Sequence, residues 1–379
     1  MSAASAAERE RLHETFAALC RIESPSGHER PCADAVRARL ERLGVAAGED
    51  GAGALVGGDC GNLFARVPGT GEGWLLFCAH LDTVPVAAPI EPVVVDGAWQ
   101  NANAAILGAD NKVAVATMLT VAERLAASPA RVGVELLFTV GEELALRGAK
   151  EFEAGVLHSS LGYTFDSAMP VGGVVVASPT YYRIGAELRG LAAHAGLRPE
   201  QGRSAILAAA RAIAAMRLGR LDSATTANIG TIAGGSAVNV VPDLCRLAGE
   251  VRSLDAARAE QLASEIADCL ADAANDPECE CDMDIAIERQ FDGYRVRATS
   301  PEVALAHLAL ADCGVEPSAI VTGGGSDANV LRARGLGVVN LANGTERNHE
   351  PGERVATDAL EAILDIAFAL VERAGERGG

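Results

Sequence analysis

Apolar residues are distributed along the chain in two patterns, one typical of helices and the other of buried strands. Near the amino-terminal end they lie three and four positions apart, as at Leu12, Phe16 and Leu19. This spacing predicts helices over residues 6–22 and 28–43. Continuous apolar runs predict buried strands at residues 62–67, 74–79, 133–140, 162–165 and 173–177. Such strands alternating with helices are typical of an α/β sheet that helices cover on both faces.

The pattern changes near residue 180. The segments that follow include strands that alternate apolar and polar residues, as half-exposed strands do, and two helices lie between them. The predicted order is strand 181–189, helix 204–217, strands 224–233 and 243–252, helix 255–274 and strand 283–290. This β-α-β-β-α-β order is that of the ferredoxin-like α+β unit.

Helices and short apolar strands alternate again from residue 301 to residue 374. We therefore predict one discontinuous α/β domain, a mixed sheet flanked by helices, formed by residues 1–178 and 292–379. A smaller ferredoxin-like α+β domain, residues 179–291, is inserted into it. The inserted domain is expected to act as a lid or dimerisation domain.

Composition and charge narrow the classes of function. The chain has 379 residues, with 51 Asp and Glu against 32 Lys and Arg, and a formal net charge of −19. A nucleic-acid binder normally needs a basic face, and an anionic membrane surface repels an acidic protein, so we expect neither partner. Because no apolar run could span a membrane and the start resembles no secretory leader, we expect a cytoplasmic protein.

The first candidate functional residues are His80 and Asp82, which follow the apolar strand segment Leu75–Ala79. In open α/β sheets ligands bind at the carboxyl ends of the strands, which is where this imidazole is expected. Asp82 is near enough to accept the second ring N–H of His80 and so fix its orientation. The alternative is a loop histidine capped by a neighbouring aspartate.

Two further segments place carboxylates in comparable positions. Asp110 opens a predicted helix, where it is either a metal ligand or, together with Asn111, a helix cap. Glu142 and Glu143 follow a predicted buried strand. Two neighbouring carboxylates can divide metal binding and water activation between them, whereas a solvated surface turn is the alternative.

Asp166 ends the predicted strand at 162–165, and His349 follows the apolar segment at 337–341. Because all these side chains follow segments of one inferred sheet, or open the helix beyond one, we expect them around one crevice. Imidazole and carboxylate ligands suit zinc, and carboxylates also tolerate cobalt or manganese. So many ligands imply two ions that share a bridging carboxylate.

In combination these motifs resemble those of the cocatalytic zinc peptidases, the family of peptidase T, carboxypeptidase G and the aminoacylases, along essentially the whole chain. The resemblance implies two Zn²⁺ ions bridged by Asp110. His80 and Asp166 would complete the ligands of the first ion. Glu143 and His349 would complete those of the second.

The resemblance also implies roles beside the metals. Asp82 would orient His80, and Glu142 would be the general base that activates the attacking water. The family joins its bridging aspartate to the next residue through a cis peptide bond, here between Asp110 and Asn111. A second aspartate is common at that position in the peptidase T-like branch, so Asn111 is a departure that leaves the ligand set intact.

Residues of the inserted domain resemble substrate-binding groups of the family. His194 resembles a histidine that reaches a neighbouring subunit's site to stabilise the oxyanion, which implies a homodimer. Asn239 and Arg252 resemble residues that bind the substrate's backbone or carboxylate. A turn histidine is the alternative for the first, and a surface ion pair is the alternative for Arg252.

The segment 323–329, Gly-Gly-Gly-Ser-Asp-Ala-Asn, resembles one in the peptidase T-like branch. It lacks the lysine and the spacing of a phosphate-binding loop. Gly324 and Ser326 are predicted to belong to a tight wall that lets a substrate backbone approach closely. A plain turn followed by a helix cap is the alternative.

These features predict a dinuclear zinc exopeptidase that acts on short peptides, nearest to a tripeptide aminopeptidase. Asp166 favours a peptidase because the family's acylases tend to carry glutamate there. The alternatives with the same site are an N-acyl amino acid deacylase, a dipeptidase and a carboxypeptidase. A non-catalytic binding protein on this scaffold would have lost its base or a ligand, whereas all key positions are present here.

Overall fold

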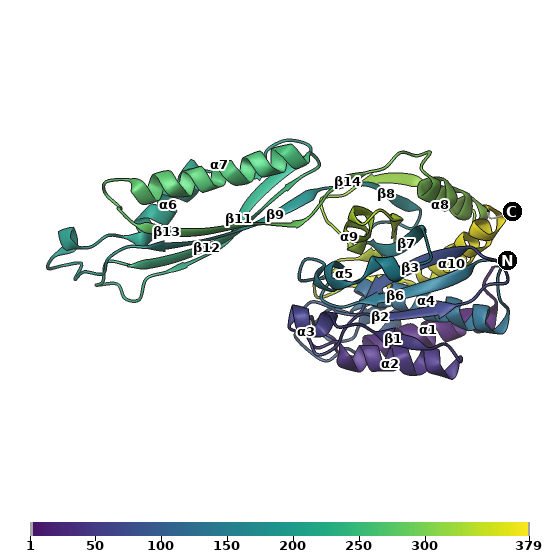
Figure 1. Cartoon of the computed structure of the whole chain (residues 1–379). Coiled ribbons are helices and arrows are strands. Elements are labelled where there is room, and N and C mark those ends of the chain that lie inside the picture. The colour runs from purple at the N-terminus through teal and green to yellow at the C-terminus, as the bar shows by residue number, and fades with distance from the viewer. Residues whose placement is uncertain (1–2, 378–379) are drawn as a thin grey trace. The chain divides into compact units, whose positions relative to one another are not determined.

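The computed structural model describes residues 3–377, which form two compact units (Figure 1). The second unit comprises Ala177–Tyr294 together with Thr322–Gly324, and the first comprises the remaining described residues. Each unit has apolar clusters of its own, so each is described by itself.

A nine-stranded mixed sheet forms the centre of the first unit, in the order β1-β2-β6-β3-β7-β16-β8-β14, with β15 beside β8. The strands β6, β3, β7 and β16 run parallel, whereas β2 and β8 are antiparallel to their neighbours β6 and β16. The bounds are β1 (Ala47–Glu49), β2 (Leu63–Val67), β3 (Trp74–His80), β6 (Gly133–Thr139), β7 (Leu161–Ser167), β8 (Gly173–Ser178), β14 (Tyr294–Arg295), β15 (Ser318–Val321) and β16 (Gly337–Ala342).

Helices cover both faces of this sheet. α4 packs on β3 and β7 and is itself covered by α1, α2 and α10, whereas α9 packs on β16 and β7. Along β3, Phe77 lies in the apolar cluster that includes α4, and Cys78 lies in the cluster that includes α9, because successive side chains of a strand point to opposite faces. The helices of this unit are α1 (Ala6–Cys20), α2 (Arg30–Arg42), α3 (Ala52–Val56), α4 (Ala109–Ala127), α5 (Arg147–Glu151), α8 (Pro301–Asp312), α9 (Asp327–Ala333) and α10 (Thr357–Arg377).

The second unit is a five-stranded antiparallel sheet, in the order β10-β11-β12-β9-β13, on which α6 and α7 pack. Its elements are β9 (Thr180–Arg189), α6 (Ala205–Ala215), β10 (Gly219–Arg220), β11 (Thr225–Gly234), β12 (Leu244–Ser253), α7 (Ala256–Asn275) and β13 (Asp282–Phe291). Apart from the short β10, this is the predicted β-α-β-β-α-β order. The predicted fold class, a mixed α/β sheet with an inserted ferredoxin-like unit, is therefore confirmed.

A four-stranded antiparallel sheet, in the order β17-β18-β5-β4, was not predicted from the sequence. Its strands are β4 (Pro92–Val95), β5 (Ala98–Asn101), β17 (Thr345–Glu346) and β18 (Arg354–Ala356). They are too short and too exposed to show a clear period in the sequence. This sheet matters for function because the loop between β17 and β18 carries His349.

The start of α4 departs from a regular helix. Its N-cap, Gly108, has φ +73° and ψ +24°, a left-handed conformation that glycine adopts at little cost. Asp110 and Asn111 have non-helical φ and ψ angles, and the peptide bond between them is cis, as the family resemblance implied. The N-cap makes no side-chain cap hydrogen bond, and the Asp110 side chain turns toward two histidines instead.

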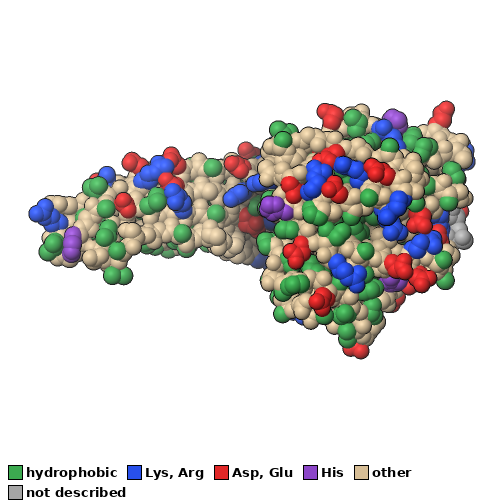
Figure 2. Space-filling model, turned by 90° about the horizontal axis from the view of Figure 1, so that it is seen from below, with side chains coloured by type: hydrophobic (Ala, Val, Ile, Leu, Met, Phe, Trp, Pro, Cys, Tyr) green, Lys and Arg blue, Asp and Glu red, His purple; other side chains and the backbone are tan. Residues whose placement is uncertain are grey.

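Charged side chains are scattered over the face of the molecule that Figure 2 shows. Acidic and basic groups are interspersed on the face visible in Figure 2, and many pair with each other, as Arg373 does with Asp312 and Arg354 does with Glu346. The nine cysteines are free. Among the described residues, no helix combines the length and the apolar character needed to span a membrane.

Candidate active site

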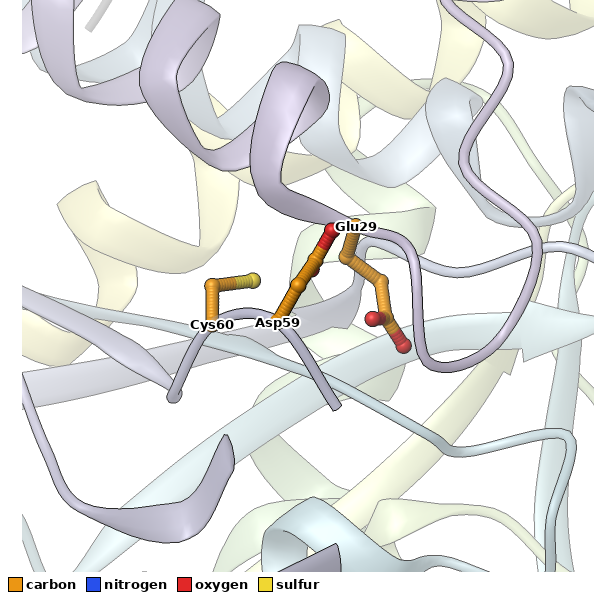
Figure 3. A group of neighbouring side chains, drawn as sticks. All are labelled: Glu29, Asp59 and Cys60. Atoms are coloured by element: carbon orange, nitrogen blue, oxygen red, sulfur yellow. The ribbon is translucent and has the colours of Figure 1, made fainter. Parts of the chain in front are cut away.

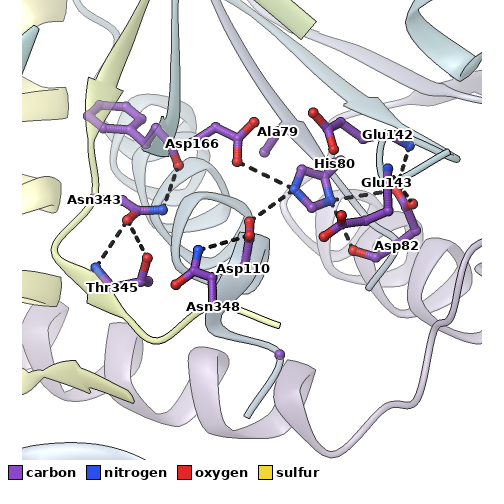
Figure 4. A network of polar contacts seen from close by, with 12 residues as sticks. Ala79, His80, Asp82, Asp110, Glu142, Glu143, Asp166, Asn343, Thr345 and Asn348 are labelled. Atoms are coloured by element: carbon purple, nitrogen blue, oxygen red, sulfur yellow. Dashed lines mark hydrogen bonds and ion pairs between the residues drawn. The ribbon is translucent and has the colours of Figure 1, made fainter. Parts of the chain in front are cut away.

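The predicted catalytic and metal-binding residues of the first unit lie together beyond the ends of its parallel strands. Figure 4 labels all of them except His349. His80 is the last residue of β3, and Asp166 lies near the end of β7. After β6, Gly141 has φ +61° and turns the chain so that Glu142 and Glu143 follow directly. The remaining members are contributed by the turn after β3, the start of α4 and the β17–β18 loop, namely Asp82, Asp110 and His349.

His80 is 1% exposed and has partners on both ring nitrogens. Its Nε2 atom lies 3.1 Å from Oδ1 of Asp110 and 3.5 Å from Oδ1 of Asp166. Its Nδ1 atom lies 2.9 Å from the backbone carbonyl oxygen of Asp82 and 3.5 Å from its Oδ1 atom. Residue 82 therefore contacts one ring nitrogen, mainly through its backbone, and the other nitrogen faces two carboxylates.

The carboxylate of Asp82 also accepts hydrogen bonds that the sequence did not predict. It accepts the backbone N–H groups of Glu142 at 3.0 Å and Glu143 at 3.1 Å, and the hydroxyl of Ser26 donates to it at 2.7 Å. The side chain of Asp82 is fully buried. It thus holds the turn that carries both glutamates beside the strand that carries His80.

A second group forms around His349, which is exposed to solvent. Its Nε2 atom lies 2.8 Å from Oε1 of Glu143 and 3.2 Å from Oδ2 of Asp110. Asp110 therefore presents one oxygen to His80 and the other to His349. This is the arrangement expected of a carboxylate that bridges two metal ions.

The donor set fits metal ions by its chemistry. Ligand atoms of His80, Glu142 and Asp166 lie within 4.8 Å of one another, and so do those of His80, Asp110 and Glu143. Imidazole nitrogens and carboxylate oxygens together are the ligands of catalytic zinc sites. Crowded, largely buried carboxylates also favour the binding of cations, because a divalent ion offsets their mutual repulsion.

Burial and crowding shift the pKa values in this group. Burial, followed by the charge of Asp166, raises the pKa of Glu142 well above its ordinary value. Burial also raises the pKa of Asp166, to about 8. Hydrogen bonds to Asp110 and Glu143 raise the pKa of His349 to about 10. Burial opposes ionisation of Asp110, yet its hydrogen bonds from His349 and His80 hold its pKa below the usual range.

Two asparagines that the sequence did not single out support these residues, the buried Asn340 and the half-buried Asn348. Asn340 on β16 brackets Asp166, because its Oδ1 atom accepts the Asp166 N–H at 2.8 Å and its Nδ2 atom donates to the Asp166 carbonyl at 3.0 Å. Asn348 donates to Oδ2 of Asp110 at 2.9 Å. The sequence marks Asn340 only as a polar residue within the otherwise apolar run at 337–341.

Another group of metal-ligand type, Glu29, Asp59 and Cys60, lies apart from these residues (Figure 3). Figure 3 shows the Cys60 thiol and the Glu29 carboxylate on opposite sides of Asp59. The Arg30 backbone N–H donates to Asp59 Oδ1 at 2.9 Å, and Glu29 Oε1 accepts the N–H of Gly141 at 3.0 Å. Ligand atoms of the three residues lie within 4.8 Å of one another, and Oε1 of Glu29 also holds the turn before Glu142.

Within the second unit, the segments that carry His194 and Asn239 lie side by side. His194 forms an isolated β-bridge with Val240, and the N–H of Ala195 donates to the carbonyl of Asn239 at 2.9 Å. Both His194 and Asn239 are exposed, so their side chains are open to solvent within this unit.

Arg252 donates through Nε and Nη2 to Glu250, each at 3.1 Å, and its guanidinium lies 4.2 Å from the centre of the Tyr181 ring. The surface ion pair that the sequence left open is therefore present. Gly324 lies in a turn, where its carbonyl accepts the hydroxyl of Ser178 at 2.8 Å. Ser326 is 2% exposed at the N-cap of α9, which is the alternative that the sequence left open.

Histidines and carboxylates that converge beyond the parallel strands of a mixed sheet are the arrangement expected of a metal-dependent hydrolase. A model of the peptidase dimerisation domain matches residues 181–278 of this chain. A model of peptidase family M28 matches residues 62–171. The first match lies in the second unit, and the other lies in the first unit.

Solved structures and a curated relative match over nearly the whole chain. Aminopeptidase PepT of Bacillus cereus ATCC 10987 is 35% identical, and the match covers 97% of this chain and 98% of that chain with a TM-score of 0.85. A tripeptidase of Staphylococcus aureus subsp. aureus Mu50 is 32% identical over 97% of this chain and 99% of that chain, with a TM-score of 0.90. The uncharacterized protein YqjE of Bacillus subtilis strain 168 is 34% identical over 97% of this chain and 99% of its own length.

The chain belongs to the cocatalytic zinc peptidase family, in its peptidase T-like branch. This confirms the predicted family and the predicted class of enzyme, a metal-dependent exopeptidase.

Proposed function

We propose that this protein is a dinuclear zinc aminopeptidase that removes the amino-terminal residue from tripeptides and similarly short peptides. The observation that carries the proposal is the position of Asp110, whose two oxygens face His80 at 3.1 Å and His349 at 3.2 Å. Two groups of ligands thus share one carboxylate. The similarity to an aminopeptidase and a tripeptidase over nearly the whole chain supports the substrate class.

In this proposal, Asp110 would be shared by two Zn²⁺ ions. His80 and Asp166 would hold the first ion, and Glu143 and His349 would hold the second, with Co²⁺ or Mn²⁺ as substitutes. When bound, the ions supply Lewis acidity, which polarises the scissile carbonyl and makes water nucleophilic near neutral pH.

Glu142 is the general base of the proposed reaction. Among the described residues, no hydrogen bond to its side chain is present, so the carboxylate is free to accept a proton. In this role Glu142 takes a proton from the attacking water and then gives it to the leaving amine. Asp82 keeps Glu142 in place by accepting its backbone N–H.

We also propose that the enzyme works as a homodimer formed through the second unit. The match of residues 181–278 to the peptidase dimerisation domain supports this. In that assembly, the exposed His194 would reach the partner's active site and stabilise the oxyanion, with Asn239 and Arg252 binding the substrate and Gly324 and Ser326 belonging to the wall of the site. Light scattering of the purified protein tests the dimer.

A substrate panel and metal analysis on the purified protein test the function. The panel contains a free tripeptide, the same tripeptide with an acetylated amino end or an amidated carboxyl end, a dipeptide and an N-acyl amino acid. We expect release of the amino-terminal residue from the free and amidated tripeptides, none from the acetylated one, and two equivalents of zinc per chain. Turnover of the N-acyl amino acid alone would identify a deacylase, and release of the carboxyl-terminal residue would identify a carboxypeptidase.

A further inference from the structure

Glu353, in the loop that precedes β18, is a buried carboxylate whose partners are all backbone N–H groups of one distant turn. It is 1% exposed. Its Oε2 atom accepts the N–H groups of Leu107 and Gly108, each at 2.8 Å, and its Oε1 atom accepts the N–H of Asp110 at 2.9 Å. Both oxygens are therefore committed to the turn that carries the bridging carboxylate.

The turn needs such an acceptor because its own backbone cannot supply one. The first N–H groups of any helix lack partners within the helix. Here the left-handed Gly108 and the non-helical Asp110 extend this irregular stretch, which lies in the protein interior. Buried N–H groups without acceptors are costly, so a carboxylate that accepts three of them stabilises this one backbone path strongly.

We propose that Glu353 is a positioning residue for the metal site: by holding the Leu107–Asp110 backbone, it sets Asp110 with one oxygen toward His80 and the other toward His349. The proposal rests on the proposed function as a metalloenzyme. Glu353 also lies in the same short loop as His349, and thus ties the two segments that meet at the second group of ligands.

The chain offers a matched control for a merely structural role. Glu135 on β6 is 0% exposed, and its carboxylate accepts the backbone N–H groups of His158 at 3.0 Å and Ser159 at 2.8 Å. It lies near the start of β6, whereas the active site follows the end of that strand. Glu135 also pairs with Arg66 at 2.9 Å and accepts the Ser159 hydroxyl at 2.5 Å. Replacing Glu135 thus removes at least as many buried contacts as replacing Glu353, without touching the turn at Asp110.

Glu353→Gln is the informative change because the amide keeps the size of the side chain but has one oxygen. If that oxygen serves Leu107 and Gly108, the amide NH₂ faces the N–H of Asp110, and two donors oppose each other. The backbone at Asp110 then shifts while the rest of the turn keeps its acceptor. Glu353→Asp retains both oxygens but withdraws them, so it is a second and milder variant.

The experiment uses the full chain, freed of metal with a chelator. Wild type, E353Q, E353D and E135Q are each titrated with Zn²⁺ by calorimetry, and thermal unfolding of the metal-free forms is recorded. We expect E353Q to bind Zn²⁺ roughly 10–100-fold more weakly than wild type and E353D to bind with intermediate affinity. E135Q should lose thermal stability yet keep the wild-type affinity. Peptidase activity of E353Q should recover as Zn²⁺ is raised.

If E353Q and E353D fold and both bind Zn²⁺ with wild-type affinity, the proposal is overturned. It is also overturned if E135Q loses as much Zn²⁺ affinity as E353Q does. If E353Q does not fold, E353D decides in the same way. If neither folds, Glu353 is required for the fold and the positioning role is wrong. Wild type that binds Zn²⁺ but cleaves no peptide contradicts only the proposed function, whereas wild type that binds no Zn²⁺ contradicts both.

Discussion

The carboxylate of Asp82 accepts the backbone N–H of Glu142, with 3.0 Å between Oδ1 and the nitrogen. The same residue contacts the His80 ring through its backbone carbonyl at 2.9 Å. One buried residue thus aligns the proposed general base with the first proposed metal ligand. The placement of Glu142 relative to His80 therefore depends on a residue that need not touch substrate.

Replacing Asp82 by Asn should impair catalysis without unfolding the chain. The amide has one acceptor oxygen, so either Glu142 or Glu143 loses its acceptor and the turn shifts. We expect kcat/KM to fall about 10–100-fold, measured on a tripeptide at saturating zinc. Ser26→Ala is the control, because it removes only the hydroxyl that donates to Asp82, and it should have a small effect. Equal effects of the two changes would contradict this role of Asp82.

Replacing Glu142 by Gln should abolish hydrolysis and leave metal binding nearly unchanged. The amide cannot take a proton from water, and general-base catalysis typically contributes about 10²–10⁴-fold. The measurements are kcat on a tripeptide and the zinc content of the variant. A variant that holds its metal and hydrolyses peptide at the wild-type rate would show that Glu142 is not the base.

Removing the metal should inactivate and destabilise the protein. Without cations, the buried and half-buried carboxylates around His80 repel one another, so chelation should lower the unfolding temperature. Adding Zn²⁺ to the stripped protein should restore both the unfolding temperature and the activity. Differential scanning calorimetry and a tripeptide assay check this, and full activity after exhaustive dialysis against chelator would contradict it.

An ion pair far from the site should govern part of the acid stability. Hydrogen bonds from Arg124, at 2.6 and 2.7 Å, lower the pKa of Glu8 from 4.5 to about 2. Since its folded-state pKa is depressed, the charge of Glu8 stabilises the fold above about pH 4.5, and this contribution is lost as the pH falls toward 2.

Glu8→Gln should therefore reduce the free energy of unfolding by about 1–3 kcal/mol at pH 7, and the deficit should vanish near pH 2. Urea unfolding at several pH values measures it. Glu10→Gln, on the exposed side of the same helix, is the control and should change little. A deficit for Glu8→Gln that is independent of pH would refute this explanation.

Most of the fold could be predicted from the sequence because its elements are long and their period is clear. The helix predicted over 6–22 is α1 at Ala6–Cys20, and the strand predicted over 243–252 is β12 at Leu244–Ser253. The four-stranded sheet with β17 and β18 was missed, since strands of two to four residues are defined by their partners rather than by their own pattern.

The candidate site was accessible to sequence reasoning because its side chains follow apolar strands or open a helix. The residues that hold these side chains in position could not be predicted from the sequence. Glu353 and Asn340 act on backbone groups that lie far away along the chain, and no local pattern predicts such a contact. The role of Asp82 was predicted only in part. Its expected contact with His80 is made mainly by its backbone carbonyl, whereas its carboxylate accepts the backbone N–H of Glu142.

The second unit interrupts the chain between most of the site and its last members. Because synthesis proceeds from the amino terminus, His80 and Asp166 leave the ribosome before this unit, and His349 and Glu353 follow it. A nascent chain that stops short of residue 349 therefore contains His80, Asp110 and Asp166 but neither the second imidazole nor the acceptor for the Asp110 backbone. The site can therefore assemble only after the second unit has been synthesised and the chain has returned to the first unit.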